Sequence, residues 1–169
     1  CSNLEKIEIP DGVTNISNLA FNGCSMLKEV KIPNSVTAIQ SRAFTDCVSL
    51  KTAVLPIGLS VVSNSLFLKC TELSSVNIPK SVTTIEYSAF YMCKGLKEIT
   101  IPDKVTTIGK GAFYGSGLTN VTIGSGIEEI EATAFGGTKD LTTITIKKSA
   151  DSIENAPWGA TNAEIIWEE

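Results

Sequence analysis

The sequence contains no histidine among its 169 residues. This absence excludes nucleophilic sites that pair a serine or cysteine with histidine, and it excludes most zinc sites, which use imidazole ligands. Uninterrupted apolar runs are only a few residues long, far below the roughly 20 that a membrane-spanning helix needs. Basic residues are fewer than acidic ones, 14 against 18, which gives a net charge of −4. A surface that binds nucleic acid needs a basic stripe, so this charge balance argues against one.

Apolar side chains, in contrast, are plentiful. Hydrophobic residues make up 43% of the chain and charged residues 19%, and the mean hydropathy is +0.17. This composition supports a packed core and excludes disorder. The length suits one ordinary domain, so we expect a single domain over residues 1–169.

The chain is built from an internal repeat of about 23 residues, which is one residue shorter between Leu96 and Leu118. Each repeat opens with leucine and an alternating string, which reads LEKIEIP (4–10), LKEVKIP (27–33), LKTAVLP (50–56), LSSVNIP (73–79), LKEITIP (96–102), LTNVTIG (118–124) and LTTITIK (141–147). A second string such as VTTI (82–85) follows. The alternation predicts short strands, and proline after the first string predicts a bend. Repeats this short bury their apolar sides only by stacking on one another.

Phenylalanine marks a third position of the repeat. All six phenylalanines fall there, and a tryptophan follows one full repeat after the last: Phe21, Phe44, Phe67, Phe90, Phe113, Phe135 and Trp158. One aromatic ring per repeat predicts a stacked column in the core. The segment around each ring has room for one helical or 3₁₀ turn at most. We therefore predict a β-rich solenoid of about seven repeats, with parallel strands in a right-handed superhelix and short helical or 3₁₀ turns. Residues 147–169 form an atypical last rung or C-terminal cap in this prediction.

Cysteine also follows the period. Cys1, Cys24, Cys47, Cys70 and Cys93 each lie one repeat apart, and Gly115 and Thr138 take their place in the last two repeats. A metal site, a disulfide framework or a reactive thiol competes here with a buried column of small side chains. Parallel Cβ vectors about 4.8 Å apart exceed the roughly 3.8 Å that a disulfide prefers. We therefore predict buried, unbridged thiols, with no metal and no cofactor.

The repeat unit C-x-x-L-x-x-V-x-I-P-x-S-V-T-x-I-x-x-x-A-F-x-x-C is clearest at 24–46 and 70–92. It resembles the leucine-rich repeats of the BspA-like family of bacterial and trichomonad surface proteins, and the resemblance covers nearly the whole chain. It implies a leucine-rich-repeat solenoid, secreted or displayed on a cell surface, that adheres to host or microbial proteins. The family has no catalytic residues to carry over. By this resemblance the chain begins within a repeat of a longer protein.

The outward positions of the first strand are candidates for ligand contact. In the later repeats they are polar and include Ser75, Asn77, Glu98, Thr100, Asn120 and Thr122. A polar sheet face suits hydrogen bonding to a protein or a glycan. The strand propensity of threonine accounts for the same composition without any ligand.

A second candidate is the residue that follows each phenylalanine. Leu68, Tyr91 and Tyr114 occupy this position in consecutive repeats, with Tyr87 and Met92 close in sequence. Clustered tyrosines are frequent at protein interfaces. Partly buried rings that cap the edge of the core are the alternative interpretation.

These observations favour a non-enzymatic module for binding and adhesion, because no nucleophile, base or metal cluster is available for catalysis. The expected partners are proteins, such as host extracellular-matrix or surface proteins, or glycans. Nucleic acid and membrane insertion within this chain are not expected. The alternatives are a structural spacer or stalk that presents other domains, and a glycan-binding module.

Overall fold

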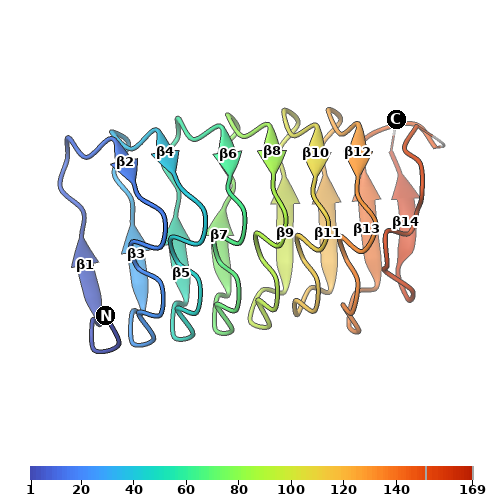
Figure 1. The fold of residues 1–169 in the computed structure, drawn as a ribbon. Helices are drawn as coiled ribbons and strands as arrows, with labels where there is room; N and C mark the ends of the chain where they lie inside the picture. Colours follow the sequence, from blue (N-terminus) through green and yellow to red (C-terminus); the bar gives the residue numbers. More distant parts are fainter. Residues whose placement is uncertain (151, 169) are drawn as a thin grey trace.

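The computed structural model describes residues 1–150 and 152–168, which form a solenoid of fourteen short strands without any helix. No helix in these residues is therefore long and apolar enough to cross a membrane. Each repeat forms one rung, and the rungs follow one another along a single axis from the N- to the C-terminal end (Figure 1). A rung has a longer strand, a bend, a two-residue strand and a tightly turned segment.

The longer strands line one side of the solenoid, called here the long-strand face. They are β1 (Lys6–Glu8), β3 (Glu29–Lys31), β5 (Thr52–Val54), β7 (Ser75–Asn77), β9 (Glu98–Ile101), β11 (Asn120–Ile123), β13 (Thr143–Ile146) and β14 (Glu164–Trp167). The two-residue strands line a second side, called the short-strand face. They are β2 (Asn15–Ile16), β4 (Ala38–Ile39), β6 (Val61–Val62), β8 (Thr84–Ile85), β10 (Thr107–Ile108) and β12 (Glu129–Ile130).

The strand pairs of the described residues are all parallel, and each joins equivalent residues of neighbouring repeats; Ile7, for example, is paired with Val30. The pairing is not continuous along either face. Strands β1, β3, β5 and β7 form one sheet of the long-strand face, and β9, β11, β13 and β14 form another. The short-strand face is divided between β4 and β6. The two divisions fall at different rungs, so one sheet continues past each of them.

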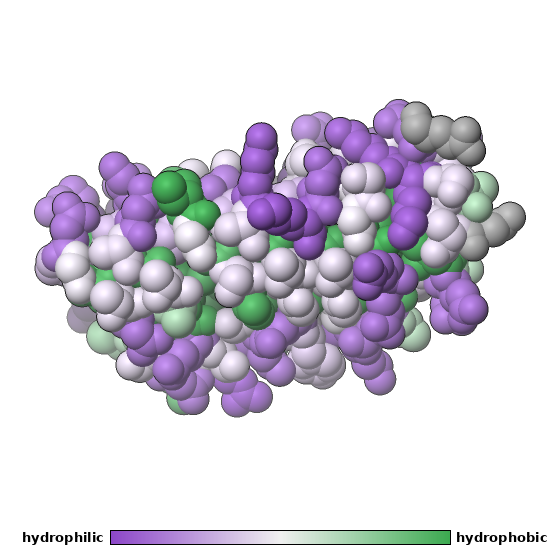
Figure 2. Space-filling view, turned by 90° about the horizontal axis from the view of Figure 1, so that it is seen from above, coloured by the Kyte–Doolittle hydropathy of each residue, from purple (hydrophilic) through white to green (hydrophobic). Residues whose placement is uncertain are grey.

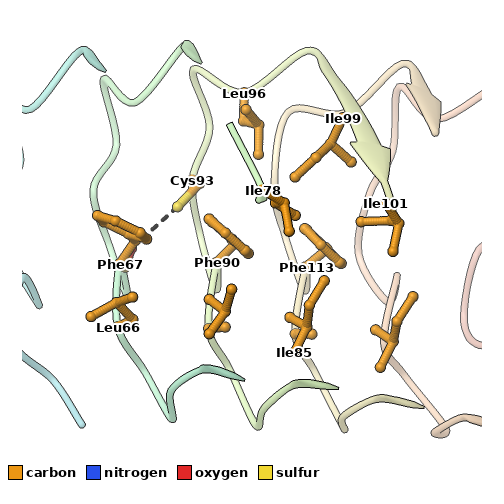
Figure 3. Close-up of a cluster of buried hydrophobic side chains, with 14 of the residues drawn as sticks. Leu66, Phe67, Ile78, Ile85, Phe90, Cys93, Leu96, Ile99, Ile101 and Phe113 are labelled. Carbon is orange, nitrogen blue, oxygen red and sulfur yellow. Dashed lines mark hydrogen bonds between the residues drawn. The ribbon is translucent and has the colours of Figure 1, made fainter. Parts of the chain in front are cut away.

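Alternation along the strands places the core as the sequence predicts. In β3, Glu29 and Lys31 are exposed and Val30 is buried between them. The phenylalanines stack along the axis with neighbouring ring centroids 5.2–5.7 Å apart and ring planes within 18° of parallel (Figure 3). Phe21, at the first rung, is half-buried, and Trp158 is buried. The solenoid of parallel strands with a stacked aromatic column is therefore confirmed.

The predicted helical or 3₁₀ turns are wrong for the described residues. The segment around each phenylalanine, called here the turn edge, has left-handed backbone two residues before and two residues after the ring. The rung of Phe44, for example, has φ of 59° at Arg42 and 58° at Asp46. A left-handed residue cannot continue a right-handed helix, so each three-residue hydrogen-bonded turn stays isolated.

These left-handed positions turn alternate amides of the turn edge toward the next rung. The amides of Phe44 and Asp46 donate to the carbonyls of Leu66 (3.1 Å) and Leu68 (2.8 Å), which belong to that next rung. Neighbouring rungs repeat the pattern, as in the bond from Phe67 to the Ala89 carbonyl at 2.8 Å. The remaining amides close the tight turns within their own rung, so the turn edge satisfies its main chain without being a strand.

The cysteines are free in the structure; Cys1 is exposed and the other four are buried. The thiols of Cys47, Cys70 and Cys93 donate to the carbonyls of Phe21, Phe44 and Phe67 at 3.1, 3.1 and 3.2 Å, which ties each rung to the one before it (Figure 3). Burial raises the pKa of the Cys24, Cys70 and Cys93 thiols above the ordinary value, because the buried site disfavours the thiolate.

One position was assigned wrongly from the sequence. Ser116, not Gly115, takes the place of cysteine in its repeat, since its amide bonds to Phe113 as that of Cys24 bonds to Phe21. The missing residue of the shortened repeat therefore lies after Ser116, where Gly117 alone makes the turn. A Cβ atom at Gly117 would lie 2.0 Å from the Lys94 carbonyl oxygen, so only glycine fits the shortened turn.

Candidate binding surface on the long-strand face

The predicted outward positions lie on the long-strand face. Ser75, Asn77, Glu98, Thr100 and Asn120 are exposed. Thr122, beside Thr100 in the neighbouring strand, is half-buried. The structure also shows a feature of this face that the sequence did not reveal, which is the gap in pairing between β7 and β9.

The gap is visible in the main-chain hydrogen bonds at the start of the strands. The Lys51 amide donates to the Lys28 carbonyl at 2.8 Å, and the Thr119 amide donates to the Lys97 carbonyl at 2.8 Å. The equivalent bond from the Lys97 amide to the Ser74 carbonyl is absent from the described residues. Strand β7 and strand β9 are therefore both edge strands, and they face each other across the gap.

Asn77 accompanies the gap with an unusual contact to the preceding rung. Its side-chain Oδ1 accepts from the Leu55 amide at 2.9 Å, and its Nδ2 donates to the Leu55 carbonyl at 3.4 Å. In an earlier rung the Ile32 amide instead bonds to a main-chain carbonyl, that of Val54, at 3.2 Å. The amide side chain of Asn77 thus replaces main-chain pairing where β7 ends.

A hollow of about 790 Å³ opens at the gap. Its floor includes Val76, Ile78, Ile99 and Ile101. These side chains belong to the hydrophobic core or pack against it. Val76 is half-buried, and Ile78 and Ile99 are 9% and 6% exposed. In the rungs of β3, β5, β11 and β13 the equivalent side chains are at most 2% exposed; they are Val30, Ile32, Ala53, Leu55, Val121, Ile123, Ile144 and Ile146. The apolar core is therefore more accessible here than in the rungs of β3, β5, β11 and β13, while inward side chains of the end strands, such as Ile7 and Ile165, are also half-buried.

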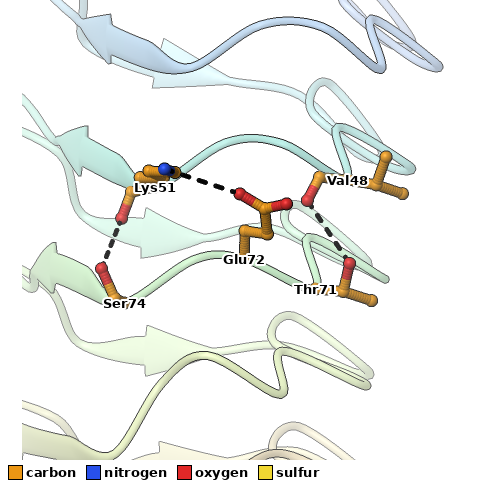
Figure 4. Close-up of polar contacts among 5 residues, drawn as sticks. All are labelled: Val48, Lys51, Thr71, Glu72 and Ser74. Atoms are coloured by element: carbon orange, nitrogen blue, oxygen red, sulfur yellow. Dashed lines mark hydrogen bonds and ion pairs between the residues drawn. The ribbon is translucent and has the colours of Figure 1, made fainter.

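Charged side chains surround the hollow. Lys80, Lys104 and Lys147 line it beyond the ends of their strands, together with Asp103, and Glu98 lies at the start of β9. These lysines have no ion pair within residues 1–150 and 152–168. The ion pairs found there lie nearer the N-terminal end, as between Lys51 and Glu72 at 3.9 Å, where hydroxyl groups also bond across rungs (Figure 4).

The predicted tyrosine patch is only partly gathered. Tyr91 and Tyr114 stack with ring centroids 5.2 Å apart and ring planes 9° from parallel, and both are half-buried. Tyr114 also lies against Gly136, where a Cβ atom would come within 2.8 Å of the ring. The faces that the two rings turn toward each other are therefore occupied, as is the side of Tyr114 that lies against Gly136. Leu68, one rung earlier, is half-buried as well.

The other two members of the patch lie apart from this stack. Met92 is half-buried against Gly115, where a Cβ atom would sit 2.8 Å from the sulfur. Tyr87 is 53% exposed and lines a separate hollow with Glu86 and Gly109.

Two exposed apolar side chains of the third rung, Val54 and Ile57, line one hollow. Ile57 is 70% exposed and Val54 is 49% exposed. Viewed onto the edge where the long strands end, the surface carries apolar colour in small separate areas among polar side chains (Figure 2). Within residues 1–150 and 152–168, no group of three or more cysteine or carboxylate side chains is arranged to hold a metal ion.

Comparison with known proteins identifies the repeat. A profile described as "BspA type Leucine rich repeat region" matches six copies over residues 1–116 and 83–166. The chain belongs to the BspA-type leucine-rich repeat family. No curated protein matches it.

Solved bacterial structures share this BspA-type fold. A leucine-rich repeat protein of Bacteroides ovatus is 28% identical, with a TM-score of 0.86 over 99% of this chain and 43% of its own. A T. pallidum leucine-rich repeat protein is 30% identical, with a TM-score of 0.76 over 82% of this chain and 69% of its own. A leucine-rich cell surface protein of Faecalibacterium prausnitzii is 29% identical, with a TM-score of 0.63 over 82% of this chain and 46% of its own. This BspA-type chain thus spans less than half the length of two of these three relatives.

Proposed function

We propose that this chain is a non-catalytic, protein-binding module of a secreted or cell-surface protein, and that it contacts its partner through the long-strand face. The observation that carries the proposal is the hollow between β7 and β9, where core side chains become accessible inside a charged rim. An accessible apolar floor with polar surroundings is the usual anatomy of a protein interface.

Two further observations support this proposal over its alternatives. The faces that Tyr91 and Tyr114 turn toward each other are covered, and Gly136 lies against Tyr114, which reduces the ring surface available to a sugar. A pure spacer has no need of the hollow, because a continuous sheet buries the core more completely, as the later rungs do. The surface location is supported by the family and by the F. prausnitzii relative, which is a leucine-rich cell surface protein.

The proposal is tested by capturing a partner and then blocking one face. The chain with Cys1→Ser is screened against immobilised extracellular-matrix proteins, mucins, glycans and bacterial surface proteins. Cysteine is then introduced as Thr100→Cys on the long-strand face or as Ala38→Cys on the short-strand face, and each is coupled to a polyethylene glycol maleimide. Both positions are exposed, and the buried thiols stay protected.

We expect saturable binding to a protein, lost when the polymer is at position 100 and retained when it is at position 38. A panel without any saturable binding would contradict the binding function and favour the spacer. Binding to glycans alone would favour the glycan-binding alternative. If binding is lost only when the polymer is attached at position 38, the contact lies on the short-strand face.

A further inference from the structure

The hollow between β7 and β9 has the shape of a site for an extended chain. It is lined along the whole of β9, from Glu98 to Ile101, and onward to Lys104. Four strand residues at about 3.3 Å each span about 13 Å, the length of a four-residue extended segment. The unpaired edges of β7 and β9 offer main-chain groups, such as the Lys97 amide, to which an extended segment can hydrogen-bond.

The floor of the hollow selects for an apolar side chain. Val76, Ile78 and Ile99 are more exposed than the equivalent side chains in the rungs of β5 and β11. An apolar side chain that enters the hollow therefore covers apolar surface that water reaches in the free chain. Elsewhere the outward positions of these strands are mostly polar, as Thr100 and Asn120 are. The accessible apolar surface of β7 and β9 therefore lies at the gap, and the exposed Val54 and Ile57 belong to the preceding rung.

The charges at the end of the hollow select for acidic groups. Lys80, Lys104 and Lys147 are exposed and have no ion pair among the described residues. The Asp103 carboxylate, also in the lining, accepts a hydrogen bond from the Ser125 amide at 3.2 Å and keeps its negative charge, so three lysines outnumber one carboxylate at this end. This end of the hollow is thus locally positive in a chain whose net charge is −4.

The same lining disfavours a nucleic-acid strand. Glu98 at the other end and Asp103 within the basic end interrupt the positive charge. A phosphate backbone needs neutralisation along its whole length, whereas a peptide can carry its carboxylates at one end only. The charge arrangement therefore fits a polypeptide better than a polyanion.

We propose that this hollow binds an extended, acidic segment of a partner protein, which rests on the binding function proposed above. An apolar side chain of the segment enters between Val76 and Ile99, and carboxylates beyond it face Lys80, Lys104 and Lys147. The lysines add attraction and orientation, and the apolar contact at the gap fixes the register.

A peptide-display selection on the chain tests this chemistry with defined probes. Random twelve-residue peptides are selected on the wild-type chain, and an enriched peptide is synthesised for titration at low and high salt. The test variant is Lys80→Glu with Lys104→Glu. The control is Lys110→Glu with Lys139→Glu, which reverses two exposed charges that do not line the hollow.

We expect enriched peptides to combine an apolar residue with at least two acidic ones. Binding should weaken about tenfold or more in the test variant, stay within about twofold in the control, and decrease with salt. Replacing the apolar residue of the peptide by serine should also weaken binding about tenfold. Circular dichroism should be unchanged in both variants, because the substituted lysines are exposed.

Three results would overturn the inference: selection of no peptides, selection of basic ones, or equal effects of the test and control variants. Its failure is distinguishable from failure of the proposed function. If a protein partner is captured and is blocked at position 100, but acidic peptides do not bind, the long-strand face binds proteins by another chemistry.

Discussion

Removing one ring from the middle of the phenylalanine column should destabilise the solenoid more than any surface change. Phe90 is fully buried, and its ring lies 5.6 Å from that of Phe67 and 5.2 Å from that of Phe113. Phenylalanine-to-alanine substitutions in cores cost about 3–5 kcal/mol, through lost burial and the cavity left behind. Because Phe90→Ala also removes two ring contacts, each worth about 0.5–1.5 kcal/mol, we expect a loss near the upper end of that range.

Phe21 provides the matched control within the same column. It is half-buried and has one ring neighbour, Phe44, at 5.2 Å. About half the burial and one contact are lost in Phe21→Ala, so the expected cost is about 1–2 kcal/mol. The comparison uses the same chemical change at two positions of one column, and only the surroundings differ.

Chemical denaturation followed by circular dichroism measures both losses. Fluorescence of Trp158 and Trp167 follows the C-terminal end separately, and coincidence of the two transitions tests whether unfolding is all-or-none. A loss below about 1 kcal/mol for Phe90→Ala, or an equal loss for Phe21→Ala, would refute the stacked-core explanation, since changes of that size are typical of surface positions.

Three other predictions concern single groups. Ser116→Ala should raise the free energy of unfolding by about 1 kcal/mol, because the buried Ser116 hydroxyl has no hydrogen-bond partner among the described residues. Urea denaturation measures this change. A loss of stability would show that the hydroxyl makes a hydrogen bond in the folded chain. Gly117→Ala should lower the free energy of unfolding by about 2 kcal/mol or more, because the new Cβ would meet the Lys94 carbonyl. The control Gly58→Ala has no atom within 4 Å of the new Cβ, so its free energy of unfolding should change by less than about 0.5 kcal/mol in the same assay. Equal losses in the two variants would contradict the shortened turn. Stability should fall as the pH rises above about 9, because folding raises the pKa of the Cys24, Cys70 and Cys93 thiols and lowers that of Cys47, through its hydrogen bond with Cys70, so that on balance the unfolded chain loses protons that the folded chain keeps. The free energy of unfolding, measured by denaturation at pH 8 and at pH 10, should therefore differ less between the two pH values in Cys93→Ala than in the wild type. An equal difference in the two proteins would contradict the raised pKa of Cys93.

The periodic part of the molecule was predictable because every repeat makes the same packing demand. A ring at the same position in six repeats has one simple explanation, and the alternation around Val30 specifies which side chains point inward. The turn edge was not predictable in the same way. Left-handed backbone occurs there at Arg42 and Lys69 as well as at glycines, and such residues carry no local signal for it.

The candidate site depends on departures from the repeat, which a repeat alignment hides. Ser75, Val76 and Asn77 have the same alternating pattern as other strands, so nothing in that string predicts that pairing stops after β7. Asn77 was recognised as outward-facing, but its bidentate contact with Leu55 requires the geometry of two rungs. The position of Ser116 was missed because the alignment was counted back from leucine, across the shortened turn.

The hydrogen bonds of the turn edge also give this edge, taken by itself, an electrical direction. The peptide units that precede Phe21, Phe44, Phe67 and Phe90 bond head to tail, each N–H to the carbonyl of the next. Each peptide unit has a dipole of about 3.5 D, and units aligned in this way add, whereas those of ordinary sheets largely cancel. The negative pole lies at the first rung, where the carbonyls of Asn18, Ala20 and Asn22 accept no hydrogen bond from the described residues. At its first rung the turn edge thus ends in carbonyl groups that are open to hydrogen-bond donors and cations.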